Sequence, residues 1–169
     1  MFGNETRTFL LTRSATFIAL ITAGAWISIP FVPVPLTLQT FFVLLAGVVM
    51  KRYAAVPAVC YLVLGSLGIP VFHNGLAGIG VLLGPTGGYL LGFIPAAVIV
   101  GLAYETDRRA IRAAGIALGS AAILGCGVLW LAGSTPLSAG TAFMVGAVPF
   151  LPGDAVKSAA GYLIAERLE

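Results

Sequence analysis

Charged residues are scarce in this chain, which has nine lysines and arginines and six aspartates and glutamates among 169 residues. They make up 9% of the chain, whereas a soluble domain has roughly a quarter. Hydrophobic residues make up 59%, and the mean hydropathy is +1.05. We therefore predict an integral membrane protein. The net charge of +3 does not indicate nucleic-acid binding, because membrane proteins keep lysine and arginine at their cytoplasmic ends.

The chain also lacks the residues from which most catalytic sites are built. It has one histidine and two cysteines. Both cysteines, Cys60 and Cys126, lie in apolar runs, so neither a disulfide framework nor a metal site is expected. There is no ATP-binding glycine loop, and the G-x-x-G-x-G run at residues 75–80 is not the dinucleotide pattern. No nucleophile stands beside a base. We expect no enzyme activity, no metal and no cofactor.

Long apolar runs are abundant. A membrane-spanning helix needs about 20 mostly apolar residues. Six segments are candidates, although three of them are short: 8–29, 36–50, 53–67, 86–104, 109–131 and 153–168. The apolar run 137–148 is too short to span, and we predict a re-entrant or interfacial helix there. The expected fold class is all-α, with six transmembrane helices in a single domain over residues 1–169.

The charges are sorted between the two sides that these helices define. All but two lie at or near the termini and in the connections around residues 51–52 and 105–112. The connections on the other side have no lysine, arginine, aspartate or glutamate. Because lysine and arginine gather on the cytoplasmic side of membrane proteins, we expect both termini in the cytoplasm and the chain in the plasma membrane.

The two exceptions are Asp154 and Lys157, near the opposite end of the last predicted helix. At a spacing of three they share one helix face. A charge at mid-bilayer costs roughly 2.5–3.5 kcal/mol, so such residues face a cavity or a partner. Asp154 could instead cap the helix, with Lys157 as its ion-pair partner. A cation in the first turn opposes the helix dipole, however, so capping does not explain Lys157. The pair favours a binding site.

Further candidates lie on the same uncharged side. The loop 71–93 is apolar and glycine-rich, which allows close approach to a ligand, and Asn74 offers both a donor and an acceptor. Asn74 could equally satisfy only the loop backbone, and His73 is expected to be an ordinary interfacial residue. Gln39 lies at the outer start of the second predicted helix, and Tyr89 is within reach of the same outer half, although interfacial tyrosines are common in an aromatic belt.

Ala15, Ala19 and Ala23 follow one another at a spacing of four in the first predicted helix. They form a smooth stripe, and small residues at this spacing let helices approach closely in lipid. The spacing alone leaves two alternatives open. The stripe either packs inside the protein or contacts another subunit.

Three ordered motifs make the chain resemble the BioY family, the biotin-specific S components of energy-coupling factor (ECF) transporters. The motifs are VPVPLTLQTFFVLLAG at 32–47, LGIPVF at 67–72 followed by GPTGGYLLGF at 84–93, and PFLPGDAVKS at 149–158. The resemblance extends over nearly the whole chain. It implies the six-helix S-component fold, biotin bound from outside, and a loop after the third helix that helps to close the site.

By motif position, the resemblance implies that Asn74, Asp154 and Lys157 contact the biotin head group. It also implies that the Ala15-x-x-x-Ala19 face docks on a transmembrane coupling subunit, which works with an ATPase pair. The chemistry agrees, because a carboxylate can accept from the ureido N–H groups while lysine and asparagine donate to the ureido carbonyl. The alternatives are an S component for another vitamin, a proton-coupled carrier relaying through Asp154, and a membrane scaffold without a ligand.

Overall fold

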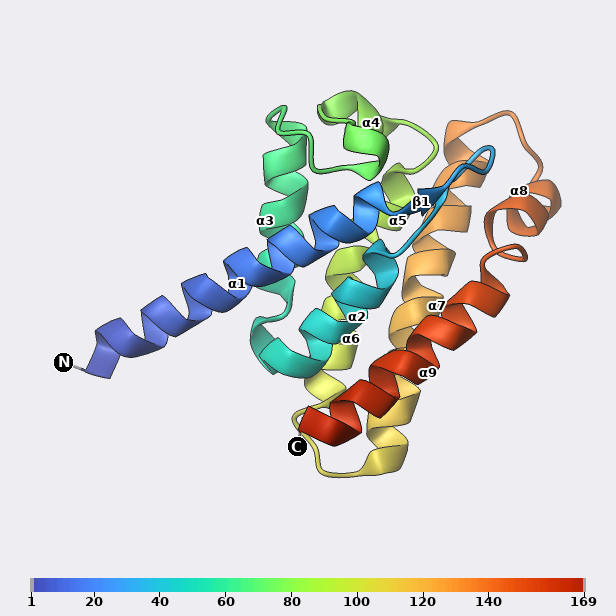
Figure 1. The fold of residues 1–169 in the computed structure, drawn as a ribbon. Coiled ribbons are helices and arrows are strands. Elements are labelled where there is room, and N and C mark those ends of the chain that lie inside the picture. The colour runs from blue at the N-terminus through green and yellow to red at the C-terminus, as the bar shows by residue number, and fades with distance from the viewer. Residues whose placement is uncertain (1, 169) are drawn as a thin grey trace.

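The computed structural model describes residues 2–168, with side chains described for residues 7–167, and it is mostly helical (Figure 1). Its elements, in chain order, are α1 (Phe2–Trp26), β1 (Ser28–Ile29), β2 (Leu36–Thr37), α2 (Gln39–Met50), the 3-10 turn η1 (Lys51–Tyr53), α3 (Ala55–Ser66), the 3-10 turn η2 (His73–Gly75), α4 (Ile79–Leu83), α5 (Gly87–Leu91), α6 (Phe93–Ala103), α7 (Arg109–Ser134), α8 (Ala139–Gly146) and α9 (Leu151–Leu168).

The apolar runs are helical as expected, and the differences lie at their ends. The helix predicted from residue 36 begins at Gln39, because Leu36 and Thr37 pair antiparallel with Ile29 and Ser28 in a small hairpin. This hairpin and α4 were not predicted. The prolines at positions 30, 33 and 35 indicate the end of a helix, since proline lacks an N–H, but they do not indicate strand pairing. The short helix expected at 137–148 is α8.

By length and apolar composition, two helical segments among the described residues are able to cross a membrane, Arg7–Trp26 and Arg109–Ser134. Two bent pairs raise the number to four if each pair is one span. These pairs are Gln39–Tyr53 with Ala55–Ser66, bent by 119°, and Ala139–Gly146 with Leu151–Arg167, bent by 52°. The all-α fold class is therefore confirmed as a mostly helical one with segments long and apolar enough to cross a membrane, while the count of six crossings and the re-entrant helix stay predictions.

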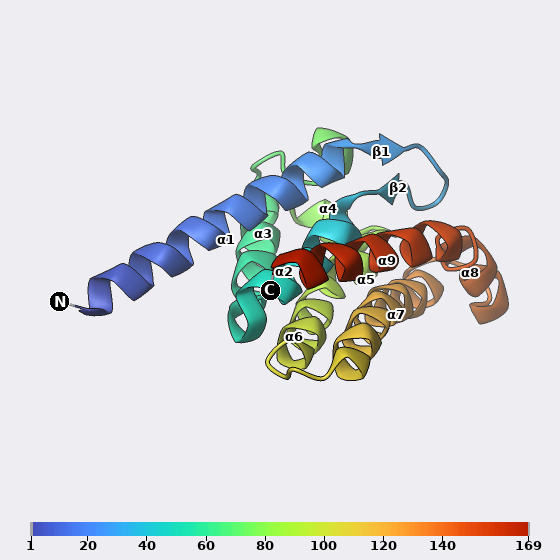
Figure 2. The same cartoon turned by 60° about the horizontal axis from the view of Figure 1, so that its bottom comes forward.

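Glycines allow α6 to lie almost directly against its neighbours. A Cβ on Gly119 of α7 would lie 2.6 Å from Cγ2 of Val100, and one on Gly47 of α2 would lie 2.5 Å from Cβ of the same valine. A Cβ on Gly115 would lie 2.2 Å from Cβ of Ala103. Close packing of this kind is a main source of helix association in lipid. Figure 2 shows α9 lying beside α2 and α7, next to this tightly packed group.

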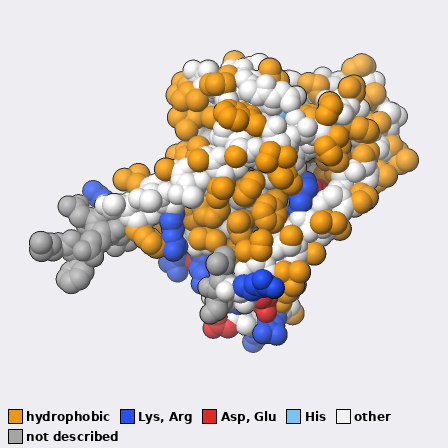
Figure 3. Space-filling model, in the orientation of Figure 1, with side chains coloured by type: hydrophobic (Ala, Val, Ile, Leu, Met, Phe, Trp, Pro, Cys, Tyr) orange, Lys and Arg blue, Asp and Glu red, His pale blue; other side chains and the backbone are white. Residues whose placement is uncertain are grey.

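The surface is apolar over most of its area and charged at one end. In Figure 3 apolar side chains cover most of the visible face, while lysine and arginine gather along its lower edge. Leu118, Leu129 and Val156 are among the large apolar side chains that are exposed, as expected for a surface in contact with lipid. Ion pairs tie the charged connections together, among them Arg52–Glu105, Arg109–Glu166 and Arg112–Asp107.

Candidate functional site

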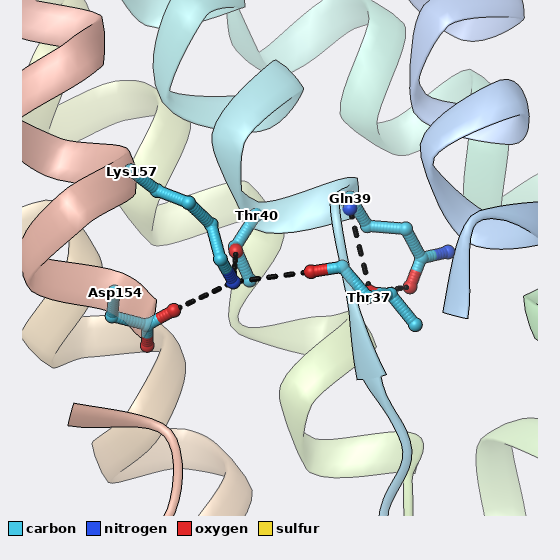
Figure 4. Close-up of polar contacts among 5 residues, drawn as sticks. All are labelled: Thr37, Gln39, Thr40, Asp154 and Lys157. Atoms are coloured by element: carbon cyan, nitrogen blue, oxygen red, sulfur yellow. Dashed lines mark hydrogen bonds and ion pairs between the residues drawn. The ribbon is translucent and has the colours of Figure 1, made fainter. Parts of the chain in front are cut away.

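Asp154 and Lys157 form an ion pair near the start of α9. Lys157 Nζ lies 2.8 Å from Asp154 Oδ1. The same ammonium donates to the carbonyl oxygen of Thr37 at 3.0 Å and to the hydroxyl of Thr40 at 2.8 Å (Figure 4). An ammonium has three N–H donors, so each one has its own acceptor. The lysine thereby ties α9 to β2 and to the start of α2.

This pair is largely removed from solvent, with side-chain exposures of 7% for Asp154 and 14% for Lys157. Burying two charges is costly unless their hydrogen bonds are satisfied. The lysine meets this condition fully. The carboxylate uses only Oδ1 within the part of the chain that the structure describes, so Oδ2 retains its capacity to accept a hydrogen bond.

The helix-cap alternative for Asp154 is wrong. The helix begins at Leu151, two residues before the predicted start, and the backbone N–H of Asp154 already donates to the carbonyl of Phe150 at 2.8 Å. Asp154 therefore lies inside the first turn, and its side chain is directed to Lys157 in the second turn. The opposing helix dipole is offset by three direct hydrogen bonds.

A small cavity of about 40 Å³ opens beside the pair. Its walls bring together the segment 34–40, η2, α5, α7 and the beginning of α9. The lining residues are Val34, Pro35, Thr37, Gln39, Thr40, His73, Thr86, Tyr89, Leu90, Phe93, Ile123, Leu124, Phe150, Asp154 and Lys157. A mostly apolar wall with a few convergent polar groups is typical of a small-molecule site.

Tyr89, predicted to bind the ligand, lines this cavity, but its hydroxyl proton is used elsewhere. The hydroxyl donates to the carbonyl of Gly146 at 2.7 Å, and the ring stacks on Phe150 with centroids 5.9 Å apart. Gly127 makes room for the ring, since a Cβ there would lie 2.2 Å from it. Tyr89 therefore contributes an aromatic wall held firmly in place.

Gln39 also lines the cavity, and its amide joins a chain of hydrogen bonds. Its Oε1 accepts from the Thr37 hydroxyl at 3.2 Å, and its Nε2 donates to the Tyr61 hydroxyl. Tyr61 in turn donates to the carbonyl of Val71 at 2.8 Å. The chain connects the polar end of the cavity to the start of the loop that leads into η2.

In η2 the structure places His73 on the cavity wall and Asn74 outside it. Asn74 is exposed, and its Oδ1 accepts from the Ser28 hydroxyl at 2.6 Å. Its φ of +56° is a left-handed conformation that asparagine tolerates better than most residues. Burial lowers the pKa of His73 below its usual value, which favours the neutral imidazole. The sequence has no signal that tells which of two adjacent loop residues faces inward.

Two threonines around the charge pair had partial signals in the sequence. Thr37 and Thr40 stand beside Gln39 as a polar group in an otherwise apolar run, and Thr40 does contact Lys157 through its side chain. Thr37 binds Lys157 through its backbone carbonyl, which no residue type reveals. Thr86 lines the cavity from the turn before α5; it lies within the GPTGGYLLGF motif but was not itself predicted as a site residue.

The predicted alanine stripe lies on the outside of the molecule. Ala15, Ala19 and Ala23 are all exposed on α1. The alternative that they pack inside the protein is therefore wrong. They are free to contact lipid or another protein.

Comparison with known proteins gives one consistent result. A family model described as the BioY family matches residues 3–169. The chain is 43% identical to the biotin transporter BioY of Thermotoga maritima over 94% of this chain and 95% of that protein. It is also 43% identical to the probable biotin transporter BioY of Pyrococcus horikoshii, over 92% and 93%. The crystal structure of the S-component for biotin from an ECF-type ABC transporter has a TM-score of 0.86 to it, with 26% identity over 98% of this chain and 93% of that chain.

Proposed function

The chain belongs to the BioY family, and we propose on that premise that it is the high-affinity biotin-binding S component of an ECF-type vitamin uptake transporter. The observation that carries the proposal is the buried Asp154–Lys157 pair on the wall of a mostly apolar cavity. The protein binds and delivers its ligand and does not convert it, so it is not an enzyme and needs no cofactor.

The ureido ring of biotin has two N–H donors and one carbonyl acceptor, and the charge pair offers the complementary groups. Oδ2 of Asp154 accepts from a ureido N–H. Lys157 now donates to the carbonyl oxygen of Thr37. When biotin binds, Lys157 releases this carbonyl and donates to the ureido carbonyl of biotin, which is chemically similar. A hydrogen bond to a charged group is worth roughly 1.5–3 kcal/mol. The exchange of one carbonyl for another keeps the ammonium satisfied throughout.

The apolar part of biotin fits the remaining wall. The thiolane ring and the valeryl chain pack against Tyr89, Phe93 and Leu124, all of which line the cavity. Asp154 and Lys157 are the charged side chains among the lining residues, so the wall offers no second cation for the biotin carboxylate. That carboxylate lies at the mouth of the site, with water or backbone donors.

Binding requires the site to open. A volume of about 40 Å³ holds a few water molecules, whereas sites for small organic ligands measure roughly 300–1,000 Å³. The segment able to move is the loop 67–86. Gly68, Gly75 and Gly78 adopt positive φ there and have open space around them. Closure of this loop over biotin brings Asn74, one residue from the wall, to the head group.

In the membrane, the six crossings are α1, α2, α3, α5 together with α6, α7, and α9, with α8 as the re-entrant or interfacial helix. Both termini are cytoplasmic, which places the cation-rich end inside. The exposed Ala15, Ala19 and Ala23 form the face on which the transmembrane coupling subunit docks. An ATPase pair bound to that subunit supplies the energy for uptake.

Calorimetry of the purified protein with biotin, thiamin and riboflavin tests the proposal. We expect binding of one biotin per chain and no heat from the other two vitamins. Preferential binding of thiamin or riboflavin would assign the protein to another vitamin. Uptake by the protein alone that a protonophore abolishes would instead indicate a proton-coupled carrier.

A further inference from the structure

A second and much larger cavity, of about 600 Å³, lies at the other end of α2. It is formed by the N-terminal half of α1 and the turn between α2 and α3, and it shares no lining residue with the cavity beside Asp154. Lysine or arginine accounts for four of its ten lining residues. Figure 3 shows basic side chains beneath the outer part of α1.

Most of this positive charge is uncompensated. Arg52 pairs with Glu105 at 2.7 Å. No carboxylate among the described side chains pairs with Arg7, Arg13 or Lys51, the other three cations of the wall. Like charges gathered around a hollow repel one another, and an anion within the hollow relieves that repulsion. The cavity is therefore suited to a negatively charged group.

Arg13 is held in position by contacts that leave its charge available. Its Nη1 lies 3.4 Å from the carbonyl oxygen of Val49, and its guanidinium carbon lies 3.8 Å from the ring centroid of Phe9. The ring contact orients the planar guanidinium without neutralising it. Guanidinium groups bind phosphate oxygens through paired hydrogen bonds, so Arg13 is preorganised for a phosphate.

Lys51 is fixed by its backbone. Its φ is +52°, a conformation that favours glycine. Its carbonyl oxygen packs on Gly101 of α6, where an added Cβ would lie 2.1 Å away. The turn therefore cannot relax toward α6. Glycine would fit this backbone conformation better than lysine. The lysine at this position adds a positive charge to the cavity wall.

The other part of the wall is apolar. Phe9, Leu10, Val49 and Met50 line the same cavity. A free inorganic anion would gain nothing from these side chains, whereas a phospholipid has a glycerol and acyl chains next to its phosphate. We propose that this cavity binds the headgroup of an anionic phospholipid, with the phosphate held by Arg13 and Lys51. Basic pockets at the membrane surface attract such lipids. The proposal rests on the proposed membrane placement and not on biotin binding.

The test compares the full-length protein in nanodiscs of phosphatidylcholine alone and with added phosphatidylglycerol. Thermal unfolding and native mass spectrometry measure stabilisation and retained lipid. We expect phosphatidylglycerol to raise the melting temperature and to remain bound several-fold more than phosphatidylcholine. The double variant Arg13→Gln/Lys51→Gln should lose most of both effects. The matched control Arg108→Gln/Arg167→Gln removes the same charge from exposed residues outside this cavity and should keep both.

Lys51→Gly guards against a folding artefact, because it removes one cation while relieving the backbone strain. It should be at least as stable as the wild type in phosphatidylcholine and gain less from phosphatidylglycerol. If the control double variant lost as much stabilisation and retained lipid as Arg13→Gln/Lys51→Gln, the effect would be due to general surface charge, and the proposed lipid site would be wrong. Stabilisation by inorganic phosphate alone to the same extent would overturn the lipid assignment. Biotin binding should be unchanged in every variant. A variant that lost biotin binding would count against the proposed biotin site and not against the lipid site.

Discussion

Helix α2 has one of the chain's two lysines at each of its ends, and the two are treated in opposite ways. At its start, Lys157 reaches in from α9, is nearly buried, and has three acceptors. Beyond its end, Lys51 is exposed on a strained turn, and its ammonium has no hydrogen-bond or ion-pair partner among the described residues. In our proposals the first belongs to the biotin site, and the second faces the membrane surface. Position in the helix packing, and not residue type, decides the role.

The largest effect on biotin affinity is expected from Lys157→Ala. Truncating one partner of a buried, hydrogen-bonded charge pair at a binding surface costs roughly 2–5 kcal/mol of binding free energy, which corresponds to a loss of about 30-fold to several thousand-fold in affinity. Because Lys157 also ties α9 to α2, the ligand-free protein should melt earlier. Calorimetry and thermal unfolding measure the two effects. Lys51→Ala is the matched control and should bind biotin normally. Near-normal affinity in the folded Lys157→Ala protein would make the pair merely structural.

A smaller loss is expected from Asp154→Asn. The amide keeps one oxygen to accept a hydrogen bond but loses the charge, and a charged hydrogen bond is worth roughly 1.5–3 kcal/mol. We expect biotin to bind roughly 10- to 100-fold more weakly. Glu105→Gln, at the other end of α2, removes a carboxylate that pairs with Arg52 and is the control. Unchanged biotin affinity in Asp154→Asn would exclude the carboxylate as the acceptor of the ureido N–H.

Asn74→Ala tests whether the loop brings this residue into the site. A neutral hydrogen bond contributes about 0.5–1.5 kcal/mol, so the affinity for biotin should fall by roughly 2- to 10-fold. Ser28→Ala removes the present partner of Asn74 while leaving Asn74 intact, so it should bind biotin at least as well as the wild type. If Asn74→Ala binds like the wild type, Asn74 stays outside the site when biotin is bound.

The pH dependence of stability should have a contribution from His73. Its pKa is lowered in the folded state, so the unfolded chain binds its proton more readily. Stability is then fully present above the usual histidine pKa and falls as the pH drops through the folded pKa. Thermal unfolding between pH 8 and pH 5 should show a steeper decline for the wild type than for His73→Gln. Parallel curves would mean that the imidazole is protonated as easily in the fold as in water.

Ala19→Trp should have no effect on biotin affinity, which makes it the smallest change in this series. Ala19 is exposed on α1 and does not line the biotin cavity. A bulky side chain there should prevent the coupling subunit from docking, so the complex should not co-purify and uptake should stop. Exposed Leu118→Trp, on α7, is the control. A complete complex with Ala19→Trp would place the docking surface elsewhere.

The sequence was sufficient for the long helices and for the charge pair, but not for the short helix α4. Apolar runs indicated each long helix, and Asp154 with Lys157 stood out because the surrounding side is uncharged. The carbonyl of Thr37 could not be anticipated, since every residue has one. His73 faces the cavity and Asn74 does not. This difference depends on the geometry of the loop, which the identity of two adjacent residues does not reveal. The second cavity joins residues of α1 and the α2–α3 turn, far apart in the sequence, so only the packing shows that their charges meet.

The hydrogen bonds between Thr37, Gln39, Tyr61 and Val71 have a direction as well as a length. Each group donates to the next: the Thr37 hydroxyl to Gln39, the Gln39 amide to Tyr61, and the Tyr61 hydroxyl to the Val71 carbonyl. With the Gln39 amide reversed, Thr37 Oγ1 would have to accept from Nε2, and the Tyr61 hydroxyl would have to donate to Oε1 and leave the Val71 carbonyl. The present order is favoured because it keeps the Val71 carbonyl hydrogen-bonded. In the proposed biotin complex Lys157 exchanges the Thr37 carbonyl for the ureido carbonyl, and these hydrogen bonds connect the residue that is released to Val71, at the start of the loop proposed to close over the ligand.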